Sequence, residues 1–309
     1  MGTEMLKLNK LQLSGIAILM VILTHTGISV FYPGFMGVDI FFFLSGYFLG
    51  HSYKSHSITE FYKRRYKRII PMFLFLAIVM SFINYYNYGG TTTLEIIGNL
   101  TTISYYLPSS NFVDWYLSSL FVFYLIFPLL YRLMSNRWNL LFLCIILISI
   151  FFVFALFDLH WRYECALGRI PVFCMGIMTY HEFVTEKHTE TYKPFIFSIV
   201  SFILVIPALM LYKEKMVETY YLFYLMAPIF IVTLNKTMAK ISIPGIIDKC
   251  LIFLGKYSLE IYVANIISLN SYYFFGENRA LLTILLTLML GFVCVKYSTC
   301  ANKFINKLF

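Results

Sequence analysis

Residues 25–50 read HTGISVFYPGFMGVDIFFFLSGYFLG, an apolar and aromatic run that nevertheless contains His25, Asp39 and Ser45. An ionised side chain inside a membrane span costs about 3 kcal/mol on insertion scales, so such groups normally face a polar cavity and pair with each other. Whether this segment holds a polar pair of that kind depends on whether lipid surrounds it. The composition of the whole chain decides that point.

The composition is that of a membrane protein. Of the 309 residues, 60% are hydrophobic and only 13% are charged, whereas soluble domains average about 45–50% apolar and about 25% charged residues. Each long apolar run approaches the length needed to cross a hydrocarbon core of about 30 Å. We therefore predict an all-α integral membrane protein, a bundle of about ten transmembrane helices near residues 11–31, 36–50, 70–87, 114–133, 139–157, 166–183, 194–212, 217–235, 248–271 and 280–300.

Lysine and arginine residues are distributed unequally between the two sides of this bundle. With the N-terminus in the cytoplasm, 19 of the 24 basic residues lie on the inner side, which is the positive-inside bias of membrane proteins. We therefore predict that both termini are cytoplasmic. This topology and contact with anionic lipid explain the net charge of +9, so nucleic acid is not an expected partner.

The chain offers little room for other kinds of domain or site. No hydrophilic stretch is long enough for an independent soluble domain, so we expect a single transmembrane domain over residues 1–309 without an appended soluble domain. The six cysteines form no CxxC pair, and three of them fall inside apolar runs, where they are expected as buried hydrophobes. Neither a disulfide framework nor a metal site is predicted.

The turn between the first two predicted spans is centred on FYPG, where Pro33 and Gly34 break the helix. With Tyr32 as its middle, His25 lies seven residues before it and Asp39 seven residues after it. In an antiparallel helical hairpin these positions share one depth, about 10 Å from the turn. A histidine that donates one ring N–H to a carboxylate keeps its other nitrogen as a base, which makes the pair a candidate catalytic unit. A packing pair, or a histidine that reaches interfacial water, is the structural alternative.

A basic cluster precedes the third predicted span. The segment FYKRRYKRIIP, residues 61–71, holds five basic residues, and Arg65 and Arg68 share one helix face at i, i+3 spacing. Arginine suits bidentate contacts with phosphate, so these two residues and Arg64 are candidate ligands of an anionic substrate. On the local sequence alone, an anchor to lipid headgroups is the better interpretation.

Other polar residues lie within or beside the apolar runs. Asp114 is expected at the outer interface, where it could cap the helix that begins near Trp115. Arg169 could snorkel from the outer end of its span, whereas Glu260 lies nearer the middle of its span and is the better functional candidate. Ser45 precedes a glycine, so close helix packing is its expected role. Ser45, Trp115, Arg169 and Glu260 are also candidates for lining a substrate cavity.

Six stretches together resemble the integral-membrane acyltransferase family 3, whose bacterial members O-acylate carbohydrates. They follow the family's order over essentially the whole chain: GIAILMVILTH, GVDIFFFLSGYFL, RRYKRIIP, WYLSSLFVFYLIFPLL, GRIPVFCMGI and LGKYSLEIYVANII. The resemblance implies that His25 is the catalytic histidine, and that Arg65, Arg68 and Pro71 belong to an Arg-x-x-Arg-Ile/Leu-x-Pro motif. It also implies a multi-pass protein of the bacterial cytoplasmic membrane.

The implied function is transfer of an acyl group, expected to be acetyl, from acyl-CoA to a hydroxyl of a cell-surface or lipid-linked carbohydrate. Acyl-CoA would be a co-substrate, and no bound cofactor is expected. Acyl-CoA is polyanionic and cytoplasmic, and Arg64, Arg65 and Arg68 supply positive charge on that side. His25 and Asp39 would carry the chemistry. His25 could take the proton of the attacking hydroxyl or carry the acyl group itself, and the sequence leaves both routes open.

Three positions depart from the family pattern: Ser14 replaces an arginine, Leu120 a glutamate and Asn265 a histidine. The departures affect the expected substrate more than the fold. The main alternative is a transporter or polysaccharide exporter that uses the His25–Asp39 pair for proton coupling. Against it, the sequence shows no repeated halves and predicts no broken helix pair. A membrane sensor or scaffold without turnover is a third, weaker alternative.

Overall fold

The computed structural model describes residues 8–88, 92–106, 114–136, 138–157, 161–185, 196, 199–200, 220–241, 243–271 and 279–308. Every regular element within these ranges is helical, as the sequence predicts. Contacts along the chain divide it into two compact units. Unit 1 comprises Met1–Ala17, Phe35–Ser57 and Ile126–Gly255, and unit 2 comprises Ile18–Gly34, Ile58–Leu125 and Lys256–Phe309.

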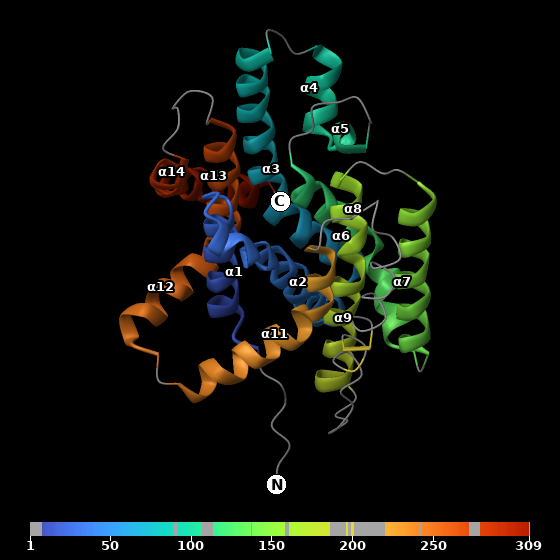
Figure 1. Cartoon of the computed structure of the whole chain (residues 1–309). Helices are drawn as coiled ribbons and strands as arrows, with labels where there is room; N and C mark the ends of the chain where they lie inside the picture. Colours follow the sequence, from blue (N-terminus) through green and yellow to red (C-terminus); the bar gives the residue numbers. More distant parts are fainter. Residues whose placement is uncertain are drawn as a thin grey trace. The chain divides into compact units, whose positions relative to one another are not determined.

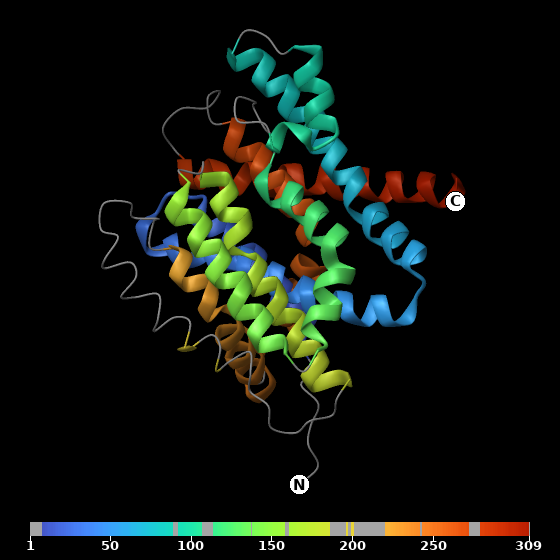
Figure 2. The ribbon, with the colours of Figure 1, turned by 90° about the vertical axis from the view of Figure 1, so that its right-hand side faces the viewer.

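Unit 1 is organised around two closely paired helices, α2 (Met36–Ser55) and α9 (Ile170–Tyr180). A side chain at Gly46 would meet the backbone carbonyl of Phe173, and one at Gly176 would meet that of Phe43. The two backbones therefore touch through paired glycines, as small residues allow in membrane bundles. Figure 2 shows α9 beside two further helices of the unit in yellow-green, α7 (Asn139–Leu156) and α8 (Trp161–Gly168).

A second pair of glycines joins the first half of α1 (Lys10–Thr24) to α12 (Gly245–Lys256). A side chain at Gly15 would meet the Leu251 carbonyl, and one at Gly255 would meet the Leu11 carbonyl. The same close approach of backbones thus recurs in unit 1. The unit is completed by the π-helical turn η2 (His181–Thr185), α11 (Tyr220–Lys240) and the second half of α6 (Trp115–Met134).

Unit 2 is built on α13 (Ser258–Asn270), which packs along α14 (Arg279–Leu308) and against α3 (Ile58–Tyr88) (Figure 1). Because α3 begins at Ile58, the basic cluster is the first part of the helix that continues into the third apolar run. A capping box at Thr92 starts α4 (Thr93–Leu100), which lies beside α3. The unit also contains α5 (Ile103–Tyr106), the second half of α1, most of the 3-10 helix η1 (Ser29–Phe35) and the first half of α6.

Among the residues that the structure describes, four helical segments are long and apolar enough to cross a membrane: Ser29–Ser55, Ile58–Tyr86, Trp115–Met134 and Leu281–Ile305. Helices α12 and α13 make a fifth if they form one broken span, while α1 and the apolar part of α7 are shorter. The chain is therefore a multi-pass helical membrane protein. The apolar runs predict about ten spans, and the described residues contain fewer by these criteria. Most of the apolar run at 194–212 lies outside the described residues.

Two local predictions are wrong. The first turn is not a symmetric hairpin about Tyr32, because α1 already ends at Thr24 and a 3-10 helix occupies residues 29–35. The span expected at 248–271 is interrupted at Tyr257, where α12 gives way to α13. The broken helix pair that the sequence analysis did not predict is therefore present.

Candidate functional site

Helix α13 carries a row of buried polar side chains in unit 2. Glu260, Tyr262, Asn265 and Ser268 are each at most 3% exposed, and each is hydrogen-bonded to a different part of the unit. Buried polar groups are costly unless they are hydrogen-bonded. These bonds therefore determine which side chains of the neighbouring segments face α13, and one of them is His25.

His25 lies immediately after the C-terminal end of α1. Gly27 has a positive φ of 76°, a conformation that glycine adopts without strain at a helix end, and the chain turns there. The hydroxyls of Thr24 and Thr26 donate to carbonyls in the last turns of α1, at 3.1 and 2.6 Å. The backbone on both sides of His25 is thus fixed, while its imidazole is half-buried.

The hydrogen-bond partner of His25 is a residue of α13. Its Nδ1 lies 2.5 Å from Oδ1 of Asn265, and Nδ2 of Asn265 donates to Oγ1 of Thr287 on α14 at 3.1 Å. Asn265 and Thr287 are fully buried. Within the described ranges, Asn265 is the hydrogen-bond partner of the imidazole, and the second ring nitrogen, Nε2, makes no hydrogen bond to these residues.

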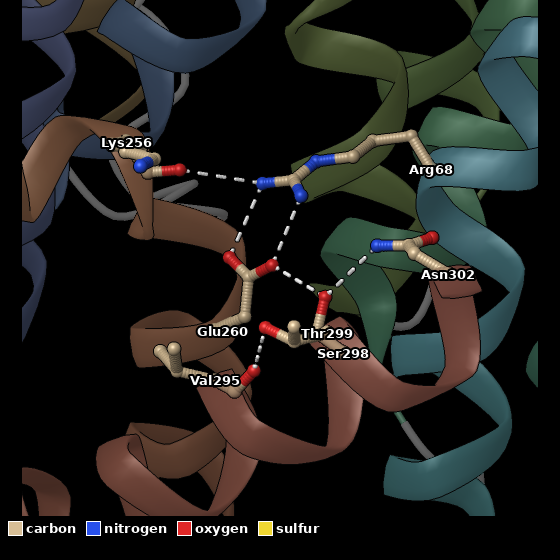
Figure 3. A network of polar contacts seen from close by, with 7 residues as sticks. All are labelled: Arg68, Lys256, Glu260, Val295, Ser298, Thr299 and Asn302. Atoms are coloured by element: carbon tan, nitrogen blue, oxygen red, sulfur yellow. Dashed lines mark hydrogen bonds and ion pairs between the residues drawn. The ribbon is translucent and has the colours of Figure 1, made fainter.

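Figure 3 shows the contacts of Glu260 on the same helix. Arg68 of α3 donates to both carboxylate oxygens, at 3.0 and 3.2 Å. Ser298 of α14 donates to Glu260 at 2.8 Å, and the Lys256 carbonyl accepts a further bond from Arg68 at 3.4 Å. Bidentate arginine–carboxylate contacts are among the strong polar contacts of proteins. Glu260 therefore ties α3, α13 and α14 together, and Arg68 is engaged by it.

The three arginines predicted to bind acyl-CoA differ in their surroundings. Arg64 forms an exposed i, i+4 ion pair with Glu60 at 2.9 Å, and Arg68 is held as described above. The guanidinium of Arg65 lies over the ring of Phe61, 6.0 Å from its centroid. Its buried Nε donates no hydrogen bond within the described residues. Arg65 is therefore the arginine of this set without a glutamate partner among the described residues, and its Nε is left as a donor.

Asp39, the expected partner of His25, lies in unit 1. It is fully buried in the first turn of α2, and its Oδ1 accepts a hydrogen bond from Nε of Arg169 at 3.0 Å. Arg169 stands between α8 and α9, and also donates to the Cys165 carbonyl at 3.1 Å. At 4% exposure, Arg169 does not snorkel to the interface as predicted. The hydrogen bonds of His25 and Asp39 thus go to Asn265 and Arg169, instead of joining the two side chains to each other as predicted.

The other predicted residues have more local roles. Asp114 caps α6, as predicted, by accepting a backbone N–H of its first turn at 2.7 Å, and it also accepts the Tyr262 hydroxyl at 2.8 Å. Trp115 is half-buried at the start of α6, and Ser45 is half-buried beside Gly46 on α2. Within the residues that the structure describes, no group of three or more His, Cys, Asp or Glu side chains could hold a metal ion.

Sequence reasoning did not identify the residues that support His25. Asn265 stood out as a polar residue within a predicted span and as a departure from a family pattern, but not as a partner of His25, and Thr287 did not stand out at all. A usable signal exists in α13, because polar residues at 260, 265 and 268 interrupt an otherwise apolar helix. Polar side chains in a membrane bundle need partners, so each of these positions requires a polar neighbour.

Comparison with known proteins now adds the family. A family model described as an acyltransferase domain matches residues 13–298. The chain belongs to acyltransferase family 3. The match includes His25, the basic start of α3 and the polar row of α13, and it confirms the family resemblance of the sequence. No solved structure matches the chain.

Three relatives carry acyltransferase names. Acyltransferase MdmB of Streptomyces mycarofaciens is 34% identical over 115 residues, which are 33% of this chain and 30% of that protein. ORF330 of Acidianus two-tailed virus, named as a candidate acetyltransferase, is 26% identical over 272 residues, 82% of this chain and 80% of its own. O-acetyltransferase OatA of Staphylococcus aureus is 38% identical over 78 residues, 23% of this chain and 13% of OatA. The matched segments thus cover less than a third of MdmB and of OatA.

Proposed function

We propose that this acyltransferase moves an acyl group, in the first instance acetyl, from acyl-CoA to a hydroxyl of a cell-surface or lipid-linked carbohydrate. Family membership supports acyl transfer, and relatives named O-acetyltransferase support an oxygen as the acceptor. The observation that carries the proposal is His25 itself. Its ring is half-buried, one nitrogen is held by a buried amide, and the other makes no hydrogen bond within the described residues.

In this mechanism His25 is the general base. Its Nε2 takes the proton of the acceptor hydroxyl while the hydroxyl oxygen attacks the thioester carbonyl. The C–S bond then breaks, and the departing CoA thiolate takes the proton from the imidazolium, so His25 returns to its neutral form. In the second route Nε2 attacks the thioester itself, the C–S bond breaks and CoA leaves as a thiolate. The hydroxyl oxygen then attacks the acyl carbon, the N–C bond breaks to restore the neutral imidazole, and the thiolate takes the hydroxyl proton. Both routes use the same nitrogen.

Arg65 is the proposed contact for the anionic part of acyl-CoA. Its guanidinium has no carboxylate partner within the described residues, whereas Arg64 and Arg68 are each paired with a glutamate. The positive-inside bias assigns the start of α3 to the cytoplasmic side, where acyl-CoA is found. Hydrogen bonds to charged groups contribute about 1.5–3 kcal/mol, which is enough to affect donor affinity measurably.

We infer a bacterial cytoplasmic-membrane location with about ten spans and both termini inside, on the basis of the apolar runs and the basic bias. The shorter apolar helices α1 and α7 would then cross with the help of their neighbours. Reporter fusions test this topology directly. A fusion at Ser55 should report the cytoplasm and one at Gly89 the outer side, and the opposite pattern would overturn the orientation of the bundle.

Transfer of label from acetyl-CoA to glycan tests the function. Purified protein should transfer label to a surface-glycan fraction, and cells lacking the protein should lose O-acyl groups from that fraction. His25→Ala should abolish transfer, whereas His56→Ala should not, because His56 is a half-buried histidine just after α2, bonded to the Ser52 carbonyl of that helix. Equal transfer by wild type and His25→Ala would contradict the proposal.

Transport remains a second candidate because α12 and α13 form a broken helix pair, a feature of many carriers. A carrier would move a labelled glycan across a proteoliposome membrane in response to a proton gradient. It would leave acetyl-CoA unconsumed. Glycan uptake without acyl transfer would therefore favour the carrier over the enzyme.

A further inference from the structure

We propose that Asn265 is the positioning residue of His25. Its side-chain amide, held by Thr287, keeps the imidazole in the tautomer with the proton on Nδ1 and the lone pair on Nε2. This inference rests on the proposed function, in which His25 acts through a lone pair on its free nitrogen. It assigns a task to one of the positions at which the sequence departs from the family pattern.

The orientation of the amide decides the tautomer. An asparagine side chain accepts through Oδ1 and donates through Nδ2. Here Nδ2 faces the Thr287 hydroxyl at 3.1 Å, so Oδ1 faces Nδ1 of His25 at 2.5 Å. Two acceptors cannot share a hydrogen bond, so Nδ1 carries the proton. In a neutral imidazole the lone pair then lies on Nε2.

The support for this contact is buried. Asn265 is 0% and Thr287 is 1% exposed, and a buried group that loses its partner costs free energy. One turn further along α13, the Ser268 hydroxyl donates to the Thr283 carbonyl of α14 at 3.2 Å. The two helices therefore hold each other in register at the level of the amide.

The sequence predicted that the carboxylate of Asp39 orients His25, whereas the side chain bonded to His25 is the neutral amide of Asn265. The carboxylate of Asp39 is bonded to Arg169, whereas Asn265 orients the ring without adding charge. Precise orientation of a catalytic group by a neighbour with a locked side chain is a general requirement of active sites. Asn265 meets that requirement through its bond to Thr287.

The tautomer of His25 can be measured by 15N NMR on the full-length protein labelled at histidine, without substrate. The chain has six histidines, and the His25 signals are those missing from His25→Gln. Wild type and Asn265→Asp, which keeps an acceptor oxygen, should show the proton on Nδ1. Asn265→Leu should show a mixture of both tautomers. Asn270→Leu is the matched control, because the half-buried Asn270 amide of α13 donates to the Ile266 carbonyl of its own helix, and it should match wild type.

Kinetics provide a second readout. Asn265→Leu should lower kcat for acyl transfer roughly tenfold to a hundredfold with little change in the KM for acyl-CoA, since it removes one buried hydrogen bond to the base. Asn265→Asp should restore most of the rate. Thr287→Val keeps the volume of the side chain but releases the amide, so it should show a smaller loss. It also provides the test if Asn265→Leu does not fold.

The two readouts separate this inference from the proposed function. An unchanged Nδ1–H tautomer in Asn265→Leu and Thr287→Val would overturn the inference, whatever the activity. Equal losses of kcat in Asn265→Leu and Asn265→Asp would also overturn it, because that pattern indicates packing alone. A wild-type protein that transfers no acyl group would contradict the proposed function, and the spectrum would still decide the role of Asn265.

Discussion

His25 and Asp39 come from one apolar segment, residues 25–50, but they have very different surroundings. His25 is half-buried at a helix end and is held by a neutral amide, with one ring nitrogen left over. Asp39 is fully buried in a helix and paired with an equally buried arginine. The first arrangement leaves an atom for chemistry, whereas the second neutralises a charge that lipid would penalise. If the proposed function holds, ionisable residues of one membrane segment serve catalysis and packing separately.

The largest expected effect is the loss of acyl transfer when His25 is replaced. His25→Ala removes the proposed base, which typically contributes about 10²- to 10⁴-fold to a rate. Because the side chain is half-buried and makes one described hydrogen bond, the variant should fold and bind acyl-CoA normally. The measurement is the transfer rate of purified protein, with donor affinity by calorimetry as the control. A variant that keeps most of its activity would remove the distinction between His25 and Asp39.

Arg169→Met tests whether the buried Asp39–Arg169 ion pair stabilises the fold. It leaves the Asp39 carboxylate buried without its countercharge, so the free energy of unfolding should fall by about 3–5 kcal/mol. Combining it with Asp39→Leu removes both charges and should recover most of that loss. Unfolding in detergent monitored by circular dichroism provides the comparison. A single variant as stable as the double variant would show that the pair does not carry the stability of this region.

The same region allows a catalytic role for Asp39 to be tested. Its second oxygen, Oδ2, accepts no hydrogen bond within the described residues. Asp39→Asn keeps the shape and removes the charge, so a purely structural pair predicts lower stability without a matching loss of kcat in the folded fraction. A loss of kcat in fully folded Asp39→Asn protein would instead return Asp39 to the catalytic role expected from the sequence.

Helix packing around Asp39 should respond to a single added methyl group. In Gly46→Ala the new carbon meets the backbone carbonyl of Phe173, and overpacking of this kind costs about 1–3 kcal/mol. Gly245→Ala is the matched control, because an added carbon there meets no atom within 4 Å. Thermal unfolding in detergent should show a lower midpoint for Gly46→Ala alone. Equal midpoints for the two variants would contradict the close approach of α2 and α9.

The sequence predicted properties that depend on short stretches. Apolar composition and run length indicate a helical membrane protein, and the cap that Asp114 gives to α6 depends on its immediate neighbours. Hydrogen-bond partners do not depend on short stretches, because Asn265 is 240 residues from His25 and Arg169 is 130 residues from Asp39. No spacing rule connects such pairs, since the packing of whole helices brings them together.

Helix ends were also difficult to predict. Pro33 and Gly34 give the stronger turn signal, but α1 ends before them, beside Gly27. The break at Tyr257 follows Gly255 and lies between Lys256 and Ser258, and an isolated glycine is weak evidence of a helix end. Because α1 ends at Thr24, His25 lies outside the helix. The estimate that placed His25 and Asp39 at the same depth assumed that His25 was helical, so it does not hold.

The smallest expected effect on activity comes from the arginines at the start of α3. Arg65→Ala should raise the KM for acyl-CoA roughly tenfold, because a charge-assisted contact contributes about 1.5–3 kcal/mol, and it should leave stability nearly unchanged. Arg64→Ala is the matched control, since it breaks only an exposed ion pair, which typically contributes about 0–1 kcal/mol.

Arg68→Ala should instead lower stability, because Glu260, at 1% exposure, loses its countercharge. Donor titrations and unfolding curves on the same preparations separate these outcomes. If Arg68→Ala raises the KM as much as Arg65→Ala and leaves stability intact, Arg68 contacts the donor as the sequence predicted, and the contact with Glu260 gives way when acyl-CoA binds.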